Sequence, residues 1–142
     1  GMSKSPKYLL PLSIFAILWN AMGCLDYTMT MLRNEDYLAD FTPEQLDYFF
    51  SFPTWMTSAW ALAVWSGLLG SFSLLFKKSF AVTAFNFSFW TMIICNGYTY
   101  VLRDDAIEMM GKGGTYFAAV IFILALYFWR ISAKLKDEGV LS

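Results

Sequence analysis

The sequence predicts an all-α membrane protein, a four-transmembrane-helix bundle with a short interfacial helix in its first outer loop. The composition is 58% hydrophobic and 20% aromatic but only 15% charged, which leaves too few charges to cover a water-soluble domain. The charges also gather in short clusters between long uncharged stretches. Each stretch is long enough to cross about 30 Å of hydrocarbon as a helix. A helix is the one form in which a single segment makes all its backbone hydrogen bonds within itself.

The spans follow one another along a single transmembrane domain covering residues 1–142. The first, about 8–31, is interrupted only by Asp26, and the second and third, about 55–76 and 79–102, contain no charged residue. The fourth, about 114–133, is the shortest, and Arg130 near its end can reach toward the lipid headgroups.

The basic residues predict the orientation, because loops rich in lysine and arginine tend to stay in the cytoplasm. One end of the predicted bundle carries Lys4, Lys7, Lys77, Lys78, Arg130, Lys134 and Lys136, and the other carries most of the acidic residues. We therefore expect a multi-pass protein with both termini in the cytoplasm. The net charge of −1 argues against a nucleic-acid partner.

The two outer loops carry helix-start signals. Thr42-Pro43-Glu44-Gln45 has an N-cap, a proline at the first helical position and a capping-box glutamine, so a short helix should begin there. Its apolar residues Leu46, Phe49 and Phe50 share one side, which we expect to rest on the membrane surface. In the second loop, Asp104 or Asp105 is a candidate cap for a turn over 106–110, followed by a flexible glycine-rich exit over 111–114.

The first and third spans share an internal echo. At an offset of 71 residues, identical pairs are Trp19 and Trp90, Cys24 and Cys95, Tyr27 and Tyr98, and Thr28 and Thr99. Both spans run outward and each is followed by a returning span, a pattern compatible with two tandem helical hairpins related by a parallel repeat. The two cysteines occupy matching depths, so they form either a disulfide or two buried thiols.

The second span carries small residues at four-residue intervals, Ala59, Ala63, Gly67 and Ser71. Such a helix-packing face lets another helix approach closely. The partner is either a helix of the same bundle or a second chain.

Polar side chains in the outer halves of the first and third spans are the candidate ligand-binding residues: Asn20, Asp26, Tyr27, Thr91, Asn96 and Tyr98. An ionisable residue inside a span is a functional candidate, but Asp26 is shallow enough for an interfacial or capping role instead. The asparagines are equally candidates for hydrogen bonds between helices. If the repeat holds, these side chains surround an outward-facing pocket for a small polar or amphiphilic solute.

Enzyme activity is the least favoured reading. The chain has no histidine, its two cysteines lack the spacing of a zinc or redox motif, and its acidic loop residues have no nucleophile beside them. We therefore expect no catalytic residue, no metal and no cofactor.

Three segments carry a resemblance to a known family: Leu18-Trp19-Asn20-Ala21-Met22-Gly23, then Gly97-Tyr98-Thr99-Tyr100, then Asp105-Ala106-Ile107-Glu108. Together they resemble a family of small, uncharacterised bacterial four-span inner-membrane proteins, some of whose members are loosely labelled sugar transporters. The likeness covers nearly the whole chain and implies a bacterial inner membrane. It supplies no set of binding residues.

Two functions stay open. The first is a transporter or binder of a small polar or amphiphilic solute, acting as a homo-oligomer because four helices alone enclose little space. The second is a structural or accessory membrane subunit that acts through helix packing. The substrate, the energy coupling and the physiological partner are not encoded in any motif that we recognise.

Overall fold

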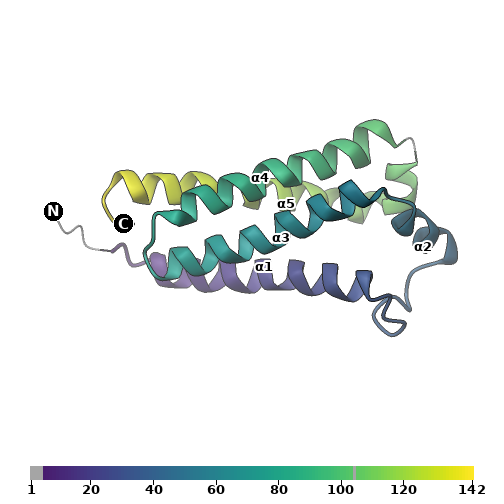
Figure 1. The fold of residues 1–142 in the computed structure, drawn as a ribbon, viewed down its shortest axis with the longest axis horizontal. Helices are drawn as coiled ribbons and strands as arrows, with labels where there is room; N and C mark the ends of the chain where they lie inside the picture. Colours follow the sequence, from purple (N-terminus) through teal and green to yellow (C-terminus); the bar gives the residue numbers. More distant parts are fainter. Residues whose placement is uncertain (1–4, 104) are drawn as a thin grey trace.

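The computed structural model describes residues 5–103 and 105–142 and shows an all-helical bundle (Figure 1). Over these residues the elements are α1 (Leu9–Met31), α2 (Pro43–Phe50), α3 (Thr54–Leu75), α4 (Phe80–Gly97), the π-helix η1 (Tyr98–Leu102) and α5 (Ala106–Asp137). The long helices α1, α3, α4 with η1, and α5 are the expected spans, and α2 is the expected short helix. The fold class predicted from the sequence is confirmed.

The helix α3 packs closely against both α1 and α4, and α4 also packs against α5. Small residues make the close approach possible, because a side chain on α3 would separate the backbones. A Cβ built on Gly70 would lie 2.9 Å from the ring of Phe85, a residue of α4 that is 2% exposed. The α3–α4 packing therefore depends on the missing side chain.

Large rings bridge α1 and α5, whose backbones lie further apart. The ring centroids of Trp19 and Phe117 are 5.7 Å apart, and those of Phe15 and Phe128 are 6.1 Å apart. Phe128 also stacks on Phe85 of α4 at 5.4 Å. Large aromatic side chains thus fill the space between α1 and α5, whereas small residues allow close packing of α3 against its neighbours.

The best-packed core lies toward the end where α1 begins and α5 finishes. Its buried members are Leu9, Ala16, Leu74, Ala81, Phe85, Phe128, Leu135, Val140 and Leu141. The chain turns back after α5 in a Schellman motif, with Gly139 at φ 80° and the amide of Val140 donating to the carbonyl of Leu135 at 2.9 Å. The amide of Ser142 then donates to the carbonyl of Lys77 at 2.9 Å, which fixes the C-terminus beside the α3–α4 turn.

The structure corrects the expected fourth span. The glycine-rich segment was expected to be a flexible exit, but α5 continues from Ala106 to Asp137 with one break, at Gly111 (φ 73°, ψ 176°). Gly113 and Gly114 are helical, because continuing the helix keeps backbone groups hydrogen-bonded. Gly111 takes up the change of direction with a backbone conformation that other residues rarely adopt. The fourth span is thus the longest of the described helices, not the shortest.

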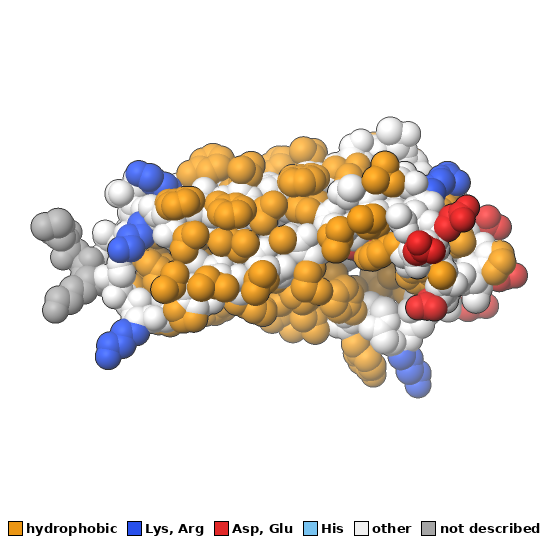
Figure 2. Space-filling view, turned by 90° about the horizontal axis from the view of Figure 1, so that it is seen from below, with side chains coloured by type: hydrophobic (Ala, Val, Ile, Leu, Met, Phe, Trp, Pro, Cys, Tyr) orange, Lys and Arg blue, Asp and Glu red, His pale blue; other side chains and the backbone are white. Residues whose placement is uncertain are grey.

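The two ends of the bundle carry different charges (Figure 2). We call one the basic end, defined by Lys7, Lys77, Lys78, Lys134 and Lys136, and the other the acidic end, defined by Glu35, Asp36, Asp40, Glu44 and Asp47. Hydrophobic side chains cover the surface between them. The start of α1 and the C-terminus both lie at the basic end, as an even number of crossings requires (Figure 1).

The echo residues of α1 and α4 make matching contacts with α3. The Cys24 thiol donates to the Val64 carbonyl at 3.3 Å, and the Cys95 thiol to the Met56 carbonyl at 3.9 Å. The matching tyrosines contact tryptophans of α3 edge-on, Tyr27 on Trp60 and Tyr98 on Trp55, each at 5.1 Å. Both cysteines are free, because each faces its own carbonyl of the intervening helix.

Candidate functional site

The structure places the predicted polar residues at several separate sites. Asn20 lies between helices: its Nδ2 donates to Ser71 Oγ of α3 at 3.1 Å and to the Ala16 carbonyl at 2.9 Å. Thr91 is buried and its hydroxyl donates to the carbonyls of Phe87 and Ser88 in its own helix. Asn20 thus links α1 to α3, whereas the Thr91 hydroxyl is satisfied within α4.

Asp26 is exposed near the acidic end of α1, where the Tyr37 hydroxyl donates to its Oδ1 at 2.6 Å. This hydrogen bond raises the pKa of Tyr37 to about 12, with burial and the negative charge of Asp26 adding to the effect. The contact ties the loop after α1 to the helix.

Tyr27 and Tyr98 pack on α3 through the ring contacts described above. Of the six candidates, Asn96 lines a cavity between α4–η1 and α5, away from the predicted space between the first and third spans. The helix α3 packs between α1 and α4, so the outer polar groups of those two helices are not brought together.

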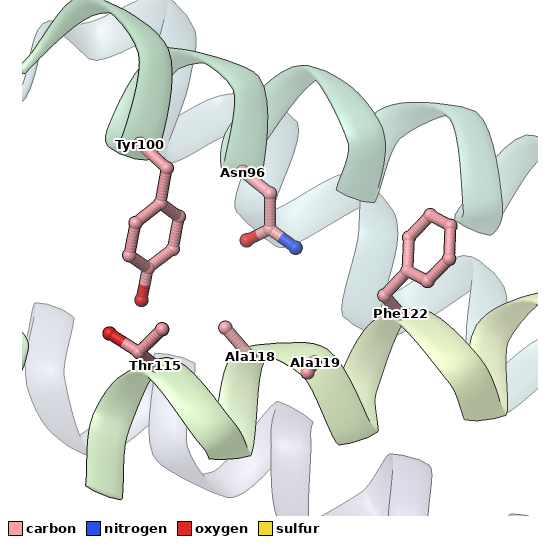
Figure 3. Close-up of a pocket in the computed structure, with 6 residues that line it drawn as sticks. All are labelled: Asn96, Tyr100, Thr115, Ala118, Ala119 and Phe122. Atoms are coloured by element: carbon pink, nitrogen blue, oxygen red, sulfur yellow. The ribbon is translucent and has the colours of Figure 1, made fainter. Parts of the chain in front are cut away.

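The cavity has a volume of about 310 Å³ and is lined by Asn96, Tyr100, Thr115, Ala118, Ala119 and Phe122 (Figure 3). Its polar groups come from both walls: the Tyr100 hydroxyl points across toward Thr115 on α5. The Asn96 amide also lines the cavity, and its Nδ2 donates to Met92 Sδ at 3.0 Å. The lining carries no formal charge. Its size lies at the lower end of the range for small-molecule sites.

Two of the cavity hydroxyls lack hydrogen-bond partners. Among the described residues, the buried side-chain oxygens without a partner are those of Tyr48, Tyr100 and Thr115. Each such group costs about 1–3 kcal/mol when it is removed from water and left unpaired. Buried polar groups in native proteins are nearly always paired, so these two hydroxyls offer hydrogen bonds to a water molecule or a solute in the cavity.

Tyr100 lies in the π-helix η1. Tyr98 and Tyr100 are two residues apart in η1 and face different sides, with Tyr98 packed on α3 and Tyr100 lining the cavity. Single π-helical turns inside transmembrane or soluble α-helices occur frequently at functional sites. The sequence pattern did not predict this turn.

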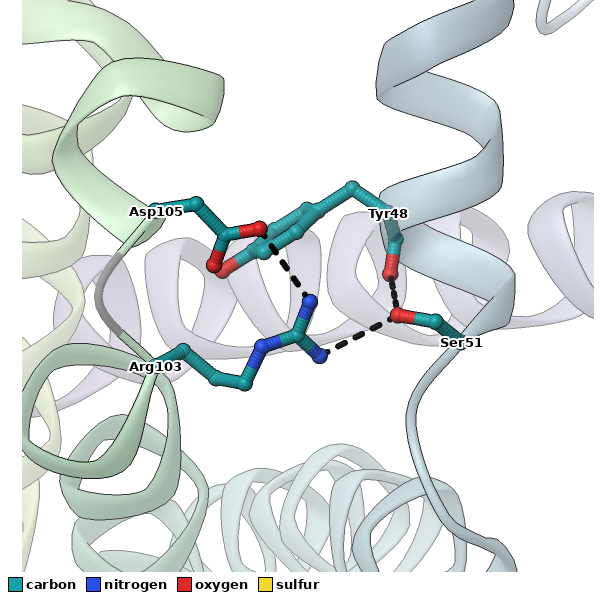
Figure 4. Close-up of polar contacts among 4 residues, drawn as sticks. All are labelled: Tyr48, Ser51, Arg103 and Asp105. Atoms are coloured by element: carbon teal, nitrogen blue, oxygen red, sulfur yellow. Dashed lines mark hydrogen bonds and ion pairs between the residues drawn. The ribbon is translucent and has the colours of Figure 1, made fainter.

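Arg103, directly after η1, joins three segments at the acidic end (Figure 4). Its Nη2 pairs with Asp105 Oδ2 at 3.3 Å and its Nη1 donates to Ser51 Oγ at 3.1 Å. The guanidinium also lies over the rings of Tyr48 and Phe52, at 4.7 and 5.3 Å from their centroids. Asp105 was a candidate helix cap, but its carboxylate binds Arg103 instead, and Asp104 lies outside the described residues.

The helix α2 begins as predicted and packs on the end of the bundle. Thr42 and Gln45 form both hydrogen bonds of the capping box, at 3.0 and 3.1 Å. Gln45 Nε2 also donates to the Met109 carbonyl of α5 at 3.2 Å, and Tyr48 is 3% exposed. Burial raises the pKa of the Tyr48 hydroxyl above its ordinary value.

The small-residue face of α3 is used inside the chain. Ala63, Gly67 and Ser71 are buried and Ala59 is half-buried. The Ser88 hydroxyl of α4 donates to the Ala63 carbonyl at 2.7 Å, and Asn20 of α1 occupies the space beside Gly67.

Within the part of the chain that the structure describes, four helices are long and apolar enough to cross a bilayer, which defines a multi-pass integral membrane protein. No family model, curated protein or solved structure matches the chain.

Sequence reasoning missed Tyr100, Thr115 and Arg103. Tyr100 belongs to the Gly97-Tyr98-Thr99-Tyr100 segment. In a regular helix Tyr98 and Tyr100 point to different sides, and the sequence does not show which of the two rings faces a cavity. Thr115 follows the glycine-rich segment and was read as the start of a lipid-facing span. Only the tertiary structure shows that Tyr100 and Thr115 line the same cavity from opposite walls.

Proposed function

We propose that this membrane protein binds a small, uncharged amphiphilic solute in the cavity between α4–η1 and α5. The observation that carries the proposal is the pair of buried, unpartnered hydroxyls of Tyr100 and Thr115 that face this cavity. The site lies within one chain, so binding needs no second copy.

The lining indicates the chemistry of the solute. Hydroxyl groups can donate to a carbonyl, ester or ether oxygen, and the uncharged lining offers nothing to balance an ion. Ala118, Ala119 and Phe122 form an apolar wall suited to a short alkyl segment. A monoacylglycerol or a fatty amide has this combination of acceptor oxygens and an apolar chain.

We also propose that the basic end faces the cytoplasm and that the acidic end, with the cavity, faces outward in a bacterial inner membrane. The support is the clustering of lysines at the basic end and the family resemblance of the sequence. The alternative function, an accessory subunit acting through the face on α3, loses its main support because that face packs against α1 and α4.

Thermal unfolding in lipid nanodiscs tests the proposal, with a short-chain monoacylglycerol as the probe. The wild-type protein should be stabilised by the monoacylglycerol and less by a fatty acid or an alkylammonium of equal length. Replacing both hydroxyls in Y100F/T115V should abolish that stabilisation. The unliganded double variant should be as stable as wild type or more stable, because the lost hydroxyls have no partners.

T99V is the matched control, because the Thr99 hydroxyl is buried but bonded to the Cys95 carbonyl at 2.9 Å. This variant should keep the response to the monoacylglycerol. Equal stabilisation of wild type and Y100F/T115V would refute the proposed site, as would an equal response to the charged amphiphiles.

A further inference from the structure

Aromatic residues connect α2 to η1 at the acidic end of the bundle. Tyr48 of α2 contacts Phe52, in the turn after α2, at 5.1 Å, and Phe52 contacts Tyr98 of η1 at 5.8 Å. Arg103 lies over the first two of these rings. Packed rings and an ion pair thus lie beside η1, the segment that carries Tyr100.

The side of the cavity formed by α5 is apolar and exposed. Ala119 and Phe122 line the cavity and are also exposed on the outer surface of the helix. Their neighbours Tyr116 and Ile123 are 70% and 60% exposed. In a bilayer these side chains contact lipid, because every long helix of this chain presents such a surface.

We propose that α2 and Arg103 form a latch over the aqueous end of the cavity, so that the solute reaches Tyr100 and Thr115 sideways from the lipid. This inference rests on the proposed function of the cavity. We define the latch as α2, Ser51, Phe52, Arg103 and Asp105.

The latch is attached to both cavity walls close to their irregular backbone. Arg103 follows Tyr100 by three residues on the π-helical side. On the other wall, Gln45 of α2 holds the Met109 carbonyl, just before the break at Gly111 and six residues before Thr115. Releasing α2 therefore frees the two segments that carry the cavity hydroxyls, and it exposes the cavity to water.

Cysteine labelling at position 115 tests the latch without any ligand. The protein is the full chain in nanodiscs, with Cys24 and Cys95 replaced by serine and Thr115→Cys as the reporter. A sulfonated, membrane-impermeant maleimide probes access from water, and an uncharged alkyl maleimide probes access from lipid. Asp36→Cys in the exposed loop provides the reference labelling rate for each reagent.

With the latch intact, the alkyl reagent should label position 115 faster, relative to the reference, than the sulfonated reagent. Arg103→Gln should raise the rate of labelling by the sulfonated reagent by about fivefold to thirtyfold, because losing one or two such contacts raises the population with the latch released by about that factor. Tyr37→Phe is the matched control, because it also removes a side-chain contact at the acidic end, the 2.6 Å hydrogen bond to Asp26, and both of these residues lie outside the latch. It should leave the rate unchanged.

Gln45→Ala provides a second, milder test, because it removes only the hydrogen bond to Met109 and should raise the sulfonated rate by a smaller factor. The proposal is overturned if the sulfonated reagent labels position 115 as fast as the reference with the latch intact. It is equally overturned if neither Arg103→Gln nor Gln45→Ala changes that rate. Failure of the monoacylglycerol assay with a normal labelling pattern would remove the proposed function and leave the latch.

Discussion

The substitution Gly67→Ala should destabilise the bundle although it improves the helix propensity of α3. An added Cβ would overlap Asn20 Oδ1 and lie 3.2 Å from Ser88 Oγ. The Asn20 side chain must then rotate and lose its hydrogen bonds to Ser71 and Ala16. The substitution thus acts through a neighbouring helix.

The expected loss is about 1–3 kcal/mol. Overpacking of a filled interior costs about 1–3 kcal/mol, and hydrogen bonds between membrane helices average about 0.6 kcal/mol each. Alanine in place of glycine offsets about 1 kcal/mol of this through helix propensity. Reversible unfolding in mixed detergent micelles measures the difference.

Gly97→Ala is the matched control, because Gly97 is helical and no described atom lies within 4 Å of a Cβ built there. This variant should be neutral or more stable by up to about 1 kcal/mol. A second comparison removes the Asn20 side chain that the new methyl group would overlap. In an Asn20→Ala background, Gly67→Ala should change the free energy of unfolding by close to nothing, since only Ser88 remains beside the new methyl group. Equal effects of the two glycine substitutions, or additive effects in the double variant, would refute this account of the α1–α3 packing.

Three further predictions concern the ends of the bundle. Thr42→Ala should destabilise α2 by about 0.5–2 kcal/mol by removing its cap, with faster amide hydrogen exchange at Gln45, and unchanged exchange would contradict the cap. Gly139→Ala should cost about 1–2 kcal/mol because its φ is 80°, whereas Gly113→Ala, in open helical space, should cost nothing in the same unfolding assay. The Tyr37 hydrogen bond should contribute stability below about pH 10 and lose it as pH rises through about 12, because the folded-state pKa is the raised one. Asp26→Asn should return the phenolate absorbance of Tyr37 toward its ordinary titration, and an unchanged titration would exclude Asp26 as the cause.

The sequence by itself predicted the long helices and the start of α2. Long uncharged segments leave a backbone in lipid no alternative to a helix, so the spans follow from hydropathy and length. The start of α2 is equally local, because Thr42 and Gln45 satisfy each other within one turn. Both features depend only on residues close together in the chain.

The tertiary structure decided which polar groups meet. Asn20 of α1 and Asn96 of α4 have the same side chain, yet one bonds to Ser71 and the other lines a cavity. The difference arises because α3 packs between α1 and α4, whereas α4–η1 and α5 form the walls of the cavity. Hydropathy is nearly uniform around α1, α3 and α4, so it carries little information about which face of these helices turns toward which neighbour. That choice is set by side-chain shape, through Gly67 on one side of α3 and the large rings between α1 and α5 on the other.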